Sequence, residues 1–568
     1  MTCLGKKYTF NLKNFHDVVF NNSHVKICPE AANRLDETRK FVDHLLENNI
    51  KVYGLSTGFA DLRNQSIDPN QAALLSCNLI ESHDAGIGSS LPLDVVLGAM
   101  AVRASSLAKG HSAFQRTSLE TLVAMINSKI IPFIPKTGSL GASGDLAFLA
   151  RVGRAMKGED VLVSYKGKVV SAREALKSEG ITPFNPLAKE GLAVTNGTSF
   201  MISMLSIAYI QEINELENLL ALQGLFYNAI GAIDAAFNNC VQNVRNQTGQ
   251  EMVSTILSRH FASSPFIDFT GVQDDYCIRC IPQIFGPKIE TILEQFPKIE
   301  RELDAVTDNP LFFKDKEISS DVNPDRYFTF KGEKWAVLSG GNFHGEYITT
   351  IADTMCAANA KIALTIERQI TYMLNPYRNK NKLPCYLITD PSLIGLASGY
   401  MITQYTANAL TQKIAQLGMP TSIFNITSAN ESEDVVSYGA SAAERLLEQI
   451  QLLHELLVIY LTVAIQAYSI VRQKHLNKGN RISSDLLAEQ LFQKIQSLTG
   501  EEYPTTIETN FERKYQAASE ILSSDALRSI MGYPLYTQLR NDKPYESLVS
   551  KFVCARSLGN FDALSRKS

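Results

Sequence analysis

The most informative stretch of the chain is Gly138-Ser139-Leu140-Gly141-Ala142-Ser143-Gly144-Asp145-Leu146. An apolar segment with two prolines (residues 130–135) precedes it, and another apolar run (residues 146–150) follows it. Glycines let a backbone turn tightly and be approached closely. The stretch is therefore a plain turn, a cradle of backbone N–H groups for an anion, or a segment whose own backbone reacts.

The neighbouring residues give the anion cradle little support. A phosphate loop of the G-x-x-x-x-G-K-[ST] kind needs a lysine and a hydroxyl after its last glycine, but Asp145 and Leu146 follow Gly144. In the third interpretation the Gly144 nitrogen attacks the Ala142 carbonyl carbon, because Gly144 has no Cβ and Ala142 is small. Loss of the Ala142 carbonyl oxygen in the ring closure and of the Ser143 hydroxyl, each as water, would then leave a five-membered ring with an electrophilic methylene.

The stretch resembles the Gly-x-x-Gly-Ala-Ser-Gly-Asp-Leu signature of the aromatic amino acid ammonia-lyases, which include the histidine ammonia-lyases. These enzymes make a methylidene-imidazolone group from Ala-Ser-Gly. The resemblance implies that Ala142, Ser143 and Gly144 form this group and that no external cofactor is needed. Similar motifs occur at several separate places between about residues 10 and 475, which argues against chance.

Composition indicates an ordinary soluble protein. The 568 residues are 45% hydrophobic and 20% charged, with a net charge of −4, so nothing favours nucleic acid or an anionic membrane as partner. The start lacks a signal-peptide apolar core, and the nine scattered cysteines favour a reduced, cytoplasmic protein over a disulfide framework. The most apolar run (residues 452–471) contains His454, Glu455 and Gln466, which predicts a buried helix rather than a membrane span.

The apolar periodicity predicts a mainly α fold, in which a bundle of long helices accompanies a smaller mixed N-terminal region that carries the reactive stretch. The predicted helices cover residues 11–20, 31–46, 200–237, 288–305, 347–372, 399–416 and 441–474. Two short apolar runs around Lys166-Gly167 predict a β-hairpin. The predicted divisions are an N-terminal region (1–199), a central long-helix bundle (200–480) and a C-terminal helical extension (481–568).

Residues 51–60 break the helical pattern with two glycines around Ser-Thr, which predicts a mobile loop. Taken alone, Tyr53 at its head is best explained as a structural anchor. The family carries its catalytic tyrosine in a Tyr-Gly-x-x-Thr-Gly-Phe segment, so the resemblance assigns Tyr53 as the catalytic base. Ala60 replaces the glycine that usually follows in the family.

Apolar periodicity after Gln71 predicts a helix that ends before Gly86 and Gly88. A lone histidine such as His83 at a helix end is most often a cap. The resemblance instead places Ser82 and His83 against the substrate ring, because histidine-acting members have Ser-His there. Some tyrosine-acting members share this dipeptide.

Asn196 lies in an Asn-Gly-Thr-Ser run, which is typical of a turn and a helix cap. The run matches the family's Glu-Gly-Leu-Ala-x-x-Asn-Gly-Thr, whose asparagine contacts the reactive ring. Residues 340–344 match Gly-Gly-Asn-Phe-His, so the resemblance places Phe343 against the same ring. His344 and Glu346 lack a third ligand at a recognisable spacing, and we predict no metal site.

Residues 273–283 interrupt the helical region. The run Cys277-Ile278-Arg279-Cys280 suggests a metal or redox motif, but no second pair at ligand spacing follows. Tyr276 and Arg279 would share a helical face, and an arginine in an apolar stretch needs either a substrate carboxylate or a buried acid. The family's Gln-Asp-x-Tyr-Ser-x-Arg-Cys-x-Pro-Gln implies that Arg279 binds the carboxylate and that Gln273 and Tyr276 position the substrate.

The acidic segment of residues 427–437 would ordinarily be a solvated loop. Histidine ammonia-lyases carry Thr-Ser-Ala-Asn followed by Gln-Glu-Asp, with the glutamate in the pocket, and Glu433 is the matching acid. One extra residue separates Asn430 from Glu433, so Glu431 competes for this assignment. Phenylalanine and tyrosine lyases more often have Gln before the Asp.

These matches predict an enzyme that eliminates ammonia from L-histidine to give trans-urocanate. Tyr53 would remove the β-proton, which requires a lowered phenol pKa, and Arg279 would hold the carboxylate. Glu433 would bind the imidazole together with the Ser-His dipeptide. The family further implies a homotetramer whose active sites combine several subunits.

Two alternatives stay open. A tyrosine or phenylalanine ammonia-lyase, or an aminomutase with the same prosthetic group, is compatible with Ser82-His83 and with residues 434–437, which resemble the non-histidine members. An inactive helical scaffold that serves as a binding partner is the other. The presence of Ala-Ser-Gly, Tyr53 and Arg279 argues against it.

Overall fold

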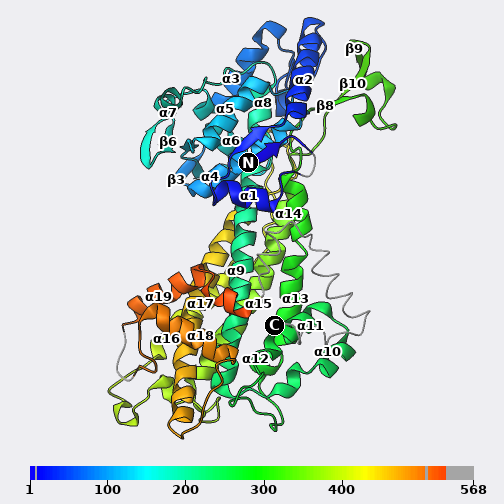
Figure 1. Cartoon of the computed structure of the whole chain (residues 1–568). Helices are drawn as coiled ribbons and strands as arrows, with labels where there is room; N and C mark the ends of the chain where they lie inside the picture. Colours follow the sequence, from blue (N-terminus) through cyan, green and yellow to red (C-terminus); the bar gives the residue numbers. More distant parts are fainter. Residues whose placement is uncertain (7–8, 506–509, 533–568) are drawn as a thin grey trace. The chain divides into compact units, whose positions relative to one another are not determined.

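Figure 1 shows the computed structural model, which describes residues 1–6, 9–505 and 510–532. The chain divides into two compact units. Unit 1 comprises residues 1–207, 297–352 and 421–444, and unit 2 comprises residues 208–296, 353–420 and 445–568. The predicted C-terminal extension (481–568) falls in unit 2, and its part from residue 533 on lies outside the described residues.

Unit 1 mixes helices with short strands. Its helices are α1 (Leu12–Val19), α2 (Pro29–Glu47), α3 (Ala72–His83), α4 (Leu93–Ala108), α5 (Arg116–Asn127), α6 (Leu146–Met156), α7 (Ala172–Glu179), α8 (Glu190–Thr195) and nearly all of α14 (Phe296–Leu303), with short 3-10 helices η1 (Ala60–Asn64), η2 (Pro69–Gln71), η4 (Asp315–Glu317) and η5 (Pro324–Arg326). Its strands pair as β1 (Thr2–Leu4) with β2 (Val25–Ile27), β3 (Ile87–Ser90) with β5 (Pro135–Thr137), β4 (Ile131–Pro132) with β6 (Leu162–Tyr165) and β7 (Lys168–Ser171), and β8 (Leu311–Lys314) with β10 (Glu333–Leu338) and β9 (Tyr327–Phe330).

Unit 2 consists of helices joined by loops, and its described residues contain no strand. The long helices α9 (Ser199–Ile230), α15 (Glu346–Leu374) and α17 (Gly439–Leu476) begin in unit 1 and continue in unit 2. The other helices of unit 2 are α10 (Asn239–Arg245), α11 (Thr248–Ser258), α12 (Tyr276–Arg279), α13 (Ile281–Leu293), α16 (Met401–Gln416), α18 (Leu487–Thr499), α19 (Phe511–Ser523) and α20 (Ala526–Met531), with 3-10 helices η3 (Asp234–Phe237), η6 (Cys385–Leu387) and η7 (Pro391–Leu393).

The mainly α fold and the β-hairpin are confirmed. Strands β6 and β7 pair in antiparallel fashion, with Val163 opposite Val170, around the predicted Lys166-Gly167 turn. Two predicted helices were too long. The helix expected over 200–237 ends at Ile230, because Gly231 adopts a left-handed φ of 59° that stops a helix.

The helix expected over residues 288–305 is two helices. Helix α13 ends at Leu293 and α14 begins at Phe296. Pro297 lies in the first turn of α14, where its missing N–H costs nothing. In a continuous helix the same proline would remove a hydrogen bond and clash with the preceding turn.

Helix α17 is the longest helix of the described residues. It is long and apolar enough to cross a membrane by composition, but 78% of its most apolar window is buried within the chain. A helix that is apolar on all sides and covered by protein is typical of the core of a large soluble protein. This agrees with the prediction for residues 452–471.

The cysteines depart in part from the expectation of a wholly reduced chain. Cys3 on β1 is disulfide-bonded to Cys28, which follows β2. The parallel pairing of these strands brings the two Cα atoms to 5.4 Å, within the range that a disulfide needs. The other cysteines of the described residues are free.

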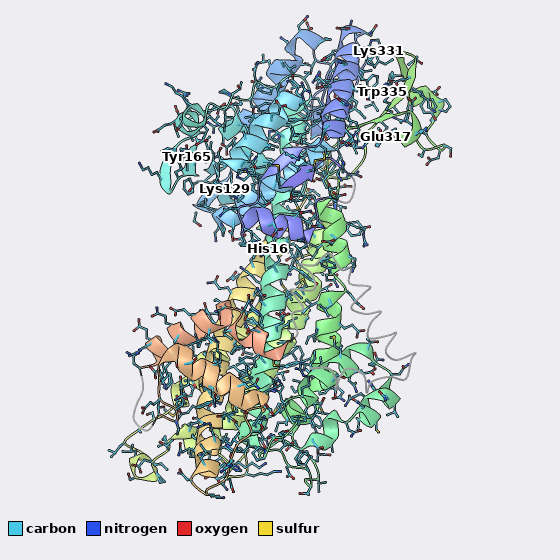
Figure 2. The ribbon with its side chains drawn as sticks, viewed as in Figure 1. His16, Lys129, Tyr165, Glu317, Lys331 and Trp335 are labelled. Carbon is cyan, nitrogen blue, oxygen red and sulfur yellow. A yellow bond between two sulfur atoms is a disulfide. The ribbon has the colours of Figure 1, made fainter. Side chains whose placement is uncertain are left out.

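A hydrophobic cluster in unit 1 fixes the start of the Tyr53 loop. Trp335 on β10 stacks on Phe41 of α2, with ring centroids 4.5 Å apart, and Figure 2 labels its position. Val52 and Leu55 belong to the same buried cluster. The residues on both sides of Tyr53 are therefore held by apolar packing.

Candidate active site

The reactive stretch in unit 1 folds back on itself. Gly141 and Gly144 form an antiparallel bridge, so the chain reverses across Ala142 and Ser143. Ser143 has a positive φ of 53° and Gly144 one of 78°. The structure therefore shows the reversal that a bond between the Ala142 carbonyl and the Gly144 nitrogen needs.

Gly144 also has no room for a side chain. A Cβ on Gly144 would lie 2.2 Å from the carbonyl oxygen of Gly197. The two glycines form a parallel bridge, and the Asp145 N–H donates to the same Gly197 oxygen at 2.8 Å. Both the backbone conformation and the close approach require glycine at position 144.

Asp145 anchors the end of the stretch. Its carboxylate is fully buried and accepts hydrogen bonds from the N–H groups of Phe200 (2.8 Å) and Met201 (3.1 Å) and from the Ser139 hydroxyl (2.9 Å). Burial raises the pKa of Asp145 to about 7, although these donors favour the charged form. The stretch is thus fixed to the start of α9.

Asn196 supplies an unused acceptor beside this stretch. Its amide nitrogen donates to the Asn309 carbonyl at 3.2 Å, but its Oδ1 is buried without a hydrogen-bond partner. A buried acceptor without a donor is costly. Together with the folded-back tripeptide, this acceptor fits a methylidene-imidazolone built from residues 142–144.

Arg103 is a site-supporting residue that the sequence analysis missed. It is fully buried on α4 and donates to the Asn196 carbonyl at 2.7 Å. Burial lowers its pKa to about 10, whereas the charges of Asp308 and Asp145 act in the opposite direction. An arginine within an apolar run, the signal that identified Arg279, would also have identified Arg103.

The Tyr53 loop is a closed hairpin in this structure. Thr57 and Ser66 form an antiparallel bridge, with η1 at the tip. The Ala60 N–H donates to the Tyr53 phenol oxygen at 3.2 Å. Ala60 has a φ of 46°, a left-handed conformation that favours glycine, so this residue adopts the backbone shape of the glycine that it replaces.

The surroundings of Tyr53 do not lower its pKa, contrary to the sequence-based requirement. Burial raises the pKa of the phenol, and the negative charge of Glu433 raises it further. The Ala60 N–H and the Arg63 guanidinium act downward but are outweighed. In the protein without a substrate, Tyr53 is a protonated phenol at neutral pH.

Glu433, and not Glu431, faces the reactive stretch. The Ser143 hydroxyl lies 3.5 Å from one Glu433 carboxylate oxygen, at the outer limit of a hydrogen bond, and the Ser428 hydroxyl donates to the other at 2.6 Å. Ser428 and Glu433 also form an antiparallel bridge. The side chain of Glu431 is exposed. The extra residue after Asn430 lies in the turn between Ser428 and Glu433.

Ser82 and His83 end helix α3 and hydrogen-bond to each other, with 3.0 Å between Ser82 Oγ and His83 Nδ1. Burial lowers the pKa of His83, and the charge of Glu433 partly opposes this shift. The same carboxylate thus acts electrostatically on both His83 and Tyr53. His83 is a neutral imidazole at neutral pH.

Phe343 is half-buried in a segment that joins the other site residues. The Gly340 N–H donates to the Asn309 side chain at 2.6 Å, and the backbone carbonyl of Asn309 accepts from Asn196. The ring nitrogen Nε2 of His344 lies 3.2 Å from the carbonyl oxygen of Val435. Unit 1 therefore contains nine of the predicted site residues: Tyr53, Ser82, His83, Ala142, Ser143, Gly144, Asn196, Phe343 and Glu433.

The three remaining predicted residues belong to unit 2. Tyr276 and Arg279 share one face of α12, as predicted, and the guanidinium lies 4.8 Å from the centre of the tyrosine ring. Arg279 Nε donates to the Asp274 carbonyl at 2.9 Å, and within the described part of the chain the guanidinium forms no ion pair. Gln273 is exposed. The guanidinium is thus oriented while still able to bind a carboxylate.

A set of neutral side chains, which we call the amide network, holds α12 through a hydrogen bond to its backbone. Gln369 Nε2 donates to the Cys277 carbonyl and to Gln223 Oε1, both at 2.9 Å. The Tyr460 hydroxyl donates to Gln369 Oε1 at 2.7 Å. Gln223, Gln369 and Tyr460 are completely buried, so each hydrogen bond replaces one with water that burial removes.

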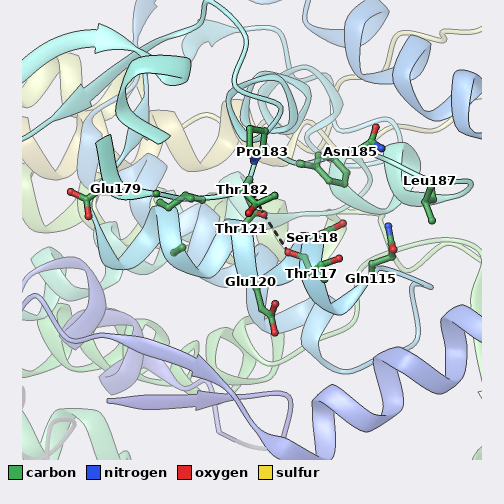
Figure 3. Close-up of a pocket in the computed structure, with 14 residues that line it drawn as sticks. Gln115, Thr117, Ser118, Glu120, Thr121, Glu179, Thr182, Pro183, Asn185 and Leu187 are labelled. Carbon is green, nitrogen blue, oxygen red and sulfur yellow. Dashed lines mark hydrogen bonds between the residues drawn. The ribbon is translucent and has the colours of Figure 1, made fainter. Parts of the chain in front are cut away.

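Unit 1 also contains a hollow of about 600 Å³ between α5 and residues 179–187, shown in Figure 3. Its lining is neutral apart from Glu120 and Glu179, and none of the predicted site residues lines it. Glu179 is already paired with Lys166 at 2.8 Å. Glu120 lies 3.8 Å from Arg116, so both carboxylates of the hollow have cationic partners. We assign the chemistry to the reactive stretch.

Comparisons with known proteins identify the family of the chain. The model of the aromatic amino acid lyase family matches residues 10–495. A histidine ammonia-lyase from Alkaliphilus metalliredigens is 36% identical over 471 residues, which cover 82% of this chain and 88% of the relative.

Two solved structures are also similar. The histidine ammonia-lyase from Trypanosoma cruzi has a TM-score of 0.80 at 26% identity, covering 95% of this chain and 98% of that one. A tyrosine aminomutase from Streptomyces globisporus has the same TM-score and identity, covering 93% and 97%. The chain therefore belongs to the aromatic amino acid lyase family.

Proposed function

We propose that the chain eliminates ammonia from L-histidine to give trans-urocanate. The observation that carries this choice is the position of Glu433, whose carboxylate reaches the Ser143 hydroxyl and acts electrostatically on His83. A carboxylate beside an imidazole suits a substrate whose ring donates hydrogen bonds or carries a positive charge. The phenylalanine ring does neither, and the tyrosine phenol donates a hydrogen bond but carries no positive charge.

The prosthetic group that residues 142–144 would form supplies an electrophile, which helps a poor leaving group depart. The elimination breaks the Cα–N bond and removes one β-proton. Tyr53 would take this proton as base. Its raised pKa is compatible with this role because a substrate ammonium close to the phenol favours the phenolate. The Ala60 N–H would stabilise the same oxygen.

The substrate carboxylate would bind Arg279. The Nε bond to the Asp274 carbonyl and the stacking on Tyr276 orient the guanidinium, and a planar fork matches a carboxylate in two-point contact. Gln273 and Tyr276 would position the substrate beside it. Asn196 and Phe343 would contact the group formed from residues 142–144, and Ser82 with His83 would contact the substrate imidazole.

The second candidate function is an aminomutase or a lyase acting on tyrosine or phenylalanine. The similarity to a tyrosine aminomutase favours it, as do residues 434–437, which resemble the non-histidine members. The Ser-His dipeptide occurs in both groups and does not exclude it. The inactive scaffold has less support, because the Ala-Ser-Gly geometry requires glycine at position 144 and leaves the Asn196 acceptor unused.

We also propose a homotetramer whose active sites combine several subunits, in the cytoplasm. Exposed apolar side chains at Ile423, Phe424, Ile426 and Val435 are typical of a surface that another subunit covers. Six free cysteines in the described residues suit a reducing compartment, whereas the Cys3–Cys28 bond does not. Light scattering tests the oligomeric state. Titration of thiols without reductant tests whether the Cys3–Cys28 bond forms in solution.

The substrate is tested by offering histidine, tyrosine and phenylalanine separately to the purified chain and following product by ultraviolet absorbance and mass spectrometry. Urocanate alone is the expected result. Coumarate or cinnamate would support the second candidate, and β-amino acids would identify an aminomutase. Failure with all substrates would favour the scaffold.

A further inference from the structure

Helix α3 ends in an unusual way for a segment that contacts a substrate. Its last residues are Ser82 and His83, and its C-cap is Asp84, with φ −76° and ψ 68°. The carboxyl end of a helix is electrically negative, so an acid there is unfavourable unless cations compensate it. The side chain of Asp84 is nevertheless only 1% exposed.

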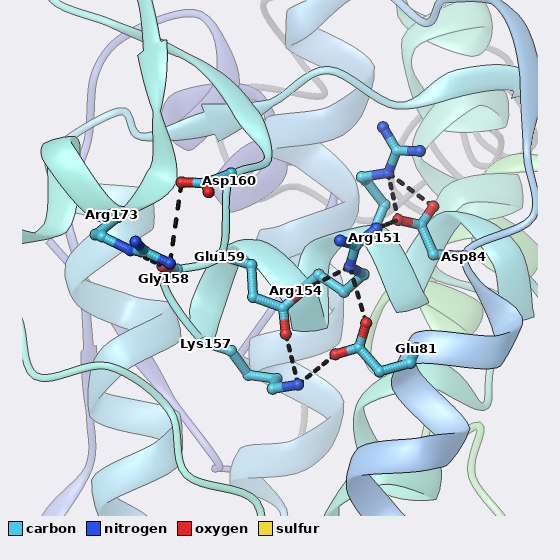
Figure 4. A network of polar contacts seen from close by, with 9 residues as sticks. All are labelled: Glu81, Asp84, Arg151, Arg154, Lys157, Gly158, Glu159, Asp160 and Arg173. Atoms are coloured by element: carbon cyan, nitrogen blue, oxygen red, sulfur yellow. Dashed lines mark hydrogen bonds and ion pairs between the residues drawn. The ribbon is translucent and has the colours of Figure 1, made fainter.

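The compensation comes from two arginines of α6, as Figure 4 shows. Arg151 Nε donates to both carboxylate oxygens of Asp84 at 2.7 Å, and Arg154 NH1 donates to Oδ2 at 2.7 Å. The two arginines are three residues apart and so share one face of α6. The acid is thus held by two cations from one helix.

The residue on the other side of the dipeptide is held by the same region. Glu81 pairs with Arg154 at 3.3 Å and with Lys157 at 2.5 Å. Glu159 bridges the two cations, at 2.6 Å from Arg154 and 2.5 Å from Lys157. We call Glu81, Asp84, Arg151, Arg154, Lys157 and Glu159 the ionic clamp.

The clamp matters because of where α6 begins. Its first residue is Leu146, and Asp145 and the Ala-Ser-Gly tripeptide come directly before it. The same short helix therefore extends from the reactive stretch to the partners of Asp84. A helix is stiff along its axis, so the clamp, together with the packing of Ile80 against Gly153 of α6, fixes the separation between the reactive stretch and the Ser82-His83 dipeptide.

From this geometry we infer that Asp84 is a positioning residue, which fixes Ser82 and His83 relative to the reactive stretch and thereby sets the enzyme's preference for its substrate side chain. The inference rests on the proposed function, in which the dipeptide contacts the substrate ring. Asp84 itself touches neither the substrate nor the reacting atoms.

The test compares Asp84→Asn with Asp160→Asn. Asp160 forms an exposed pair with Arg173 at 3.9 Å in the same region and serves as the matched control. For Asp84→Asn we expect KM for histidine to rise by about 10- to 100-fold, as for other misplaced substrate contacts, with a smaller change in kcat. Asp84→Glu should recover part of the loss, and the control should match the wild type.

A second readout needs no activity. In Asp84→Asn, backbone amide hydrogen exchange should accelerate in peptides covering residues 79–88 and stay unchanged elsewhere. If Asp84→Asn does not fold, Arg151→Lys, which keeps the charge but loses the fork, takes its place in both measurements.

The outcomes distinguish a failure of the proposed function from a failure of the positioning role of Asp84. A wild type without activity on histidine contradicts the proposed function, and the exchange data alone then decide whether the clamp orders the end of α3. Unchanged KM and exchange in Asp84→Asn would overturn the inference. Accelerated exchange throughout the chain of Asp84→Asn would also overturn it. The same holds for a fall in kcat without a change in KM that Asp84→Glu does not restore.

Discussion

In unit 1 the residues that flank Ser82 and His83 are held by charged side chains, whereas in unit 2 the helix that carries Arg279 is held by neutral amides. The cations of the ionic clamp are partly open to water, with Arg151 at 25% and Arg154 at 30% exposure, although the side chain of Asp84 is only 1% exposed. Gln223 and Gln369 of the amide network are 0% exposed. Two segments with comparable proposed tasks thus rest on different interactions.

The difference follows from what burial allows. An ion pair at a surface keeps part of its hydration but is weakened by salt. A buried charge would need complete pairing, whereas neutral amides can satisfy one another without water. We therefore expect the clamp to respond to ionic strength and the amide network to respond only to loss of a partner.

The largest expected effect is on kcat, from a variant in unit 1, and it contrasts with an effect on KM from a variant in unit 2. Tyr53→Phe removes the proposed base and should lower kcat by about 10²- to 10⁴-fold with little change in KM. Arg279→Lys loses the planar fork and should mainly raise KM. Steady-state kinetics with histidine measure both. A Tyr53→Phe enzyme with wild-type kcat would contradict the assignment of the base.

The next effect tests the amide network. Gln369→Leu removes the hydrogen bonds of Gln369 to the Cys277 carbonyl, Gln223 and the Tyr460 hydroxyl and leaves only the 3.1 Å bond from Gln223 Nε2 to Tyr460, so the free energy of unfolding should fall by about 2–4 kcal/mol. Urea titration measures this loss, and KM should rise because α12 carries Arg279.

The double variant Gln223→Leu/Gln369→Leu serves as its control. It removes both amide partners and should recover part of the stability, because fewer buried polar groups remain unpaired. If the double variant loses more free energy of unfolding than the two single variants lose together, the network as described is wrong.

A third prediction concerns pH. The charge of Glu433 raises the pKa of Tyr53, and a base must be deprotonated to act. The rate therefore rises with pH through this pKa, and Glu433→Gln should move the rising limb of kcat/KM to lower pH. Histidine and a slower substrate should show the same shift. A limb that moves to higher pH would contradict the placement of Glu433.

The smallest effect is that of salt. Raising ionic strength from about 0.1 M to about 1 M shortens the screening length from roughly 10 to 3 Å. KM for histidine should rise a few-fold in the wild type and less in Asp84→Asn, which already lacks the clamp's central charge. Equal salt responses in the two proteins would show that the clamp is not the salt-sensitive element.

The sequence predicted whatever depends on neighbours along the chain. The long helices, the hairpin and the shared face of Tyr276 and Arg279 follow from periodicity and turn residues, and the resemblance identified the motifs. The choice of Glu433 over Glu431 depends on a contact between residues 143 and 433, which no local pattern shows.

The electrostatics were also beyond the sequence. The raised pKa of Tyr53 depends on burial and on Glu433, and the partners of Asp84 lie 67 and 70 residues further along the chain. Asp84, Arg151 and Arg154 resemble ordinary surface charges in sequence. Only the fold brings them together.

The most direct test of the central claim is the mass of one peptide. Trypsin cuts after Lys136 and Arg151, which releases residues 137–151 with the whole Ala-Ser-Gly stretch. In the active protein this peptide should be lighter than its sequence by two waters, and Ser143→Ala should lose both this deficit and the activity. An active enzyme whose peptide has the full sequence mass would contradict the account.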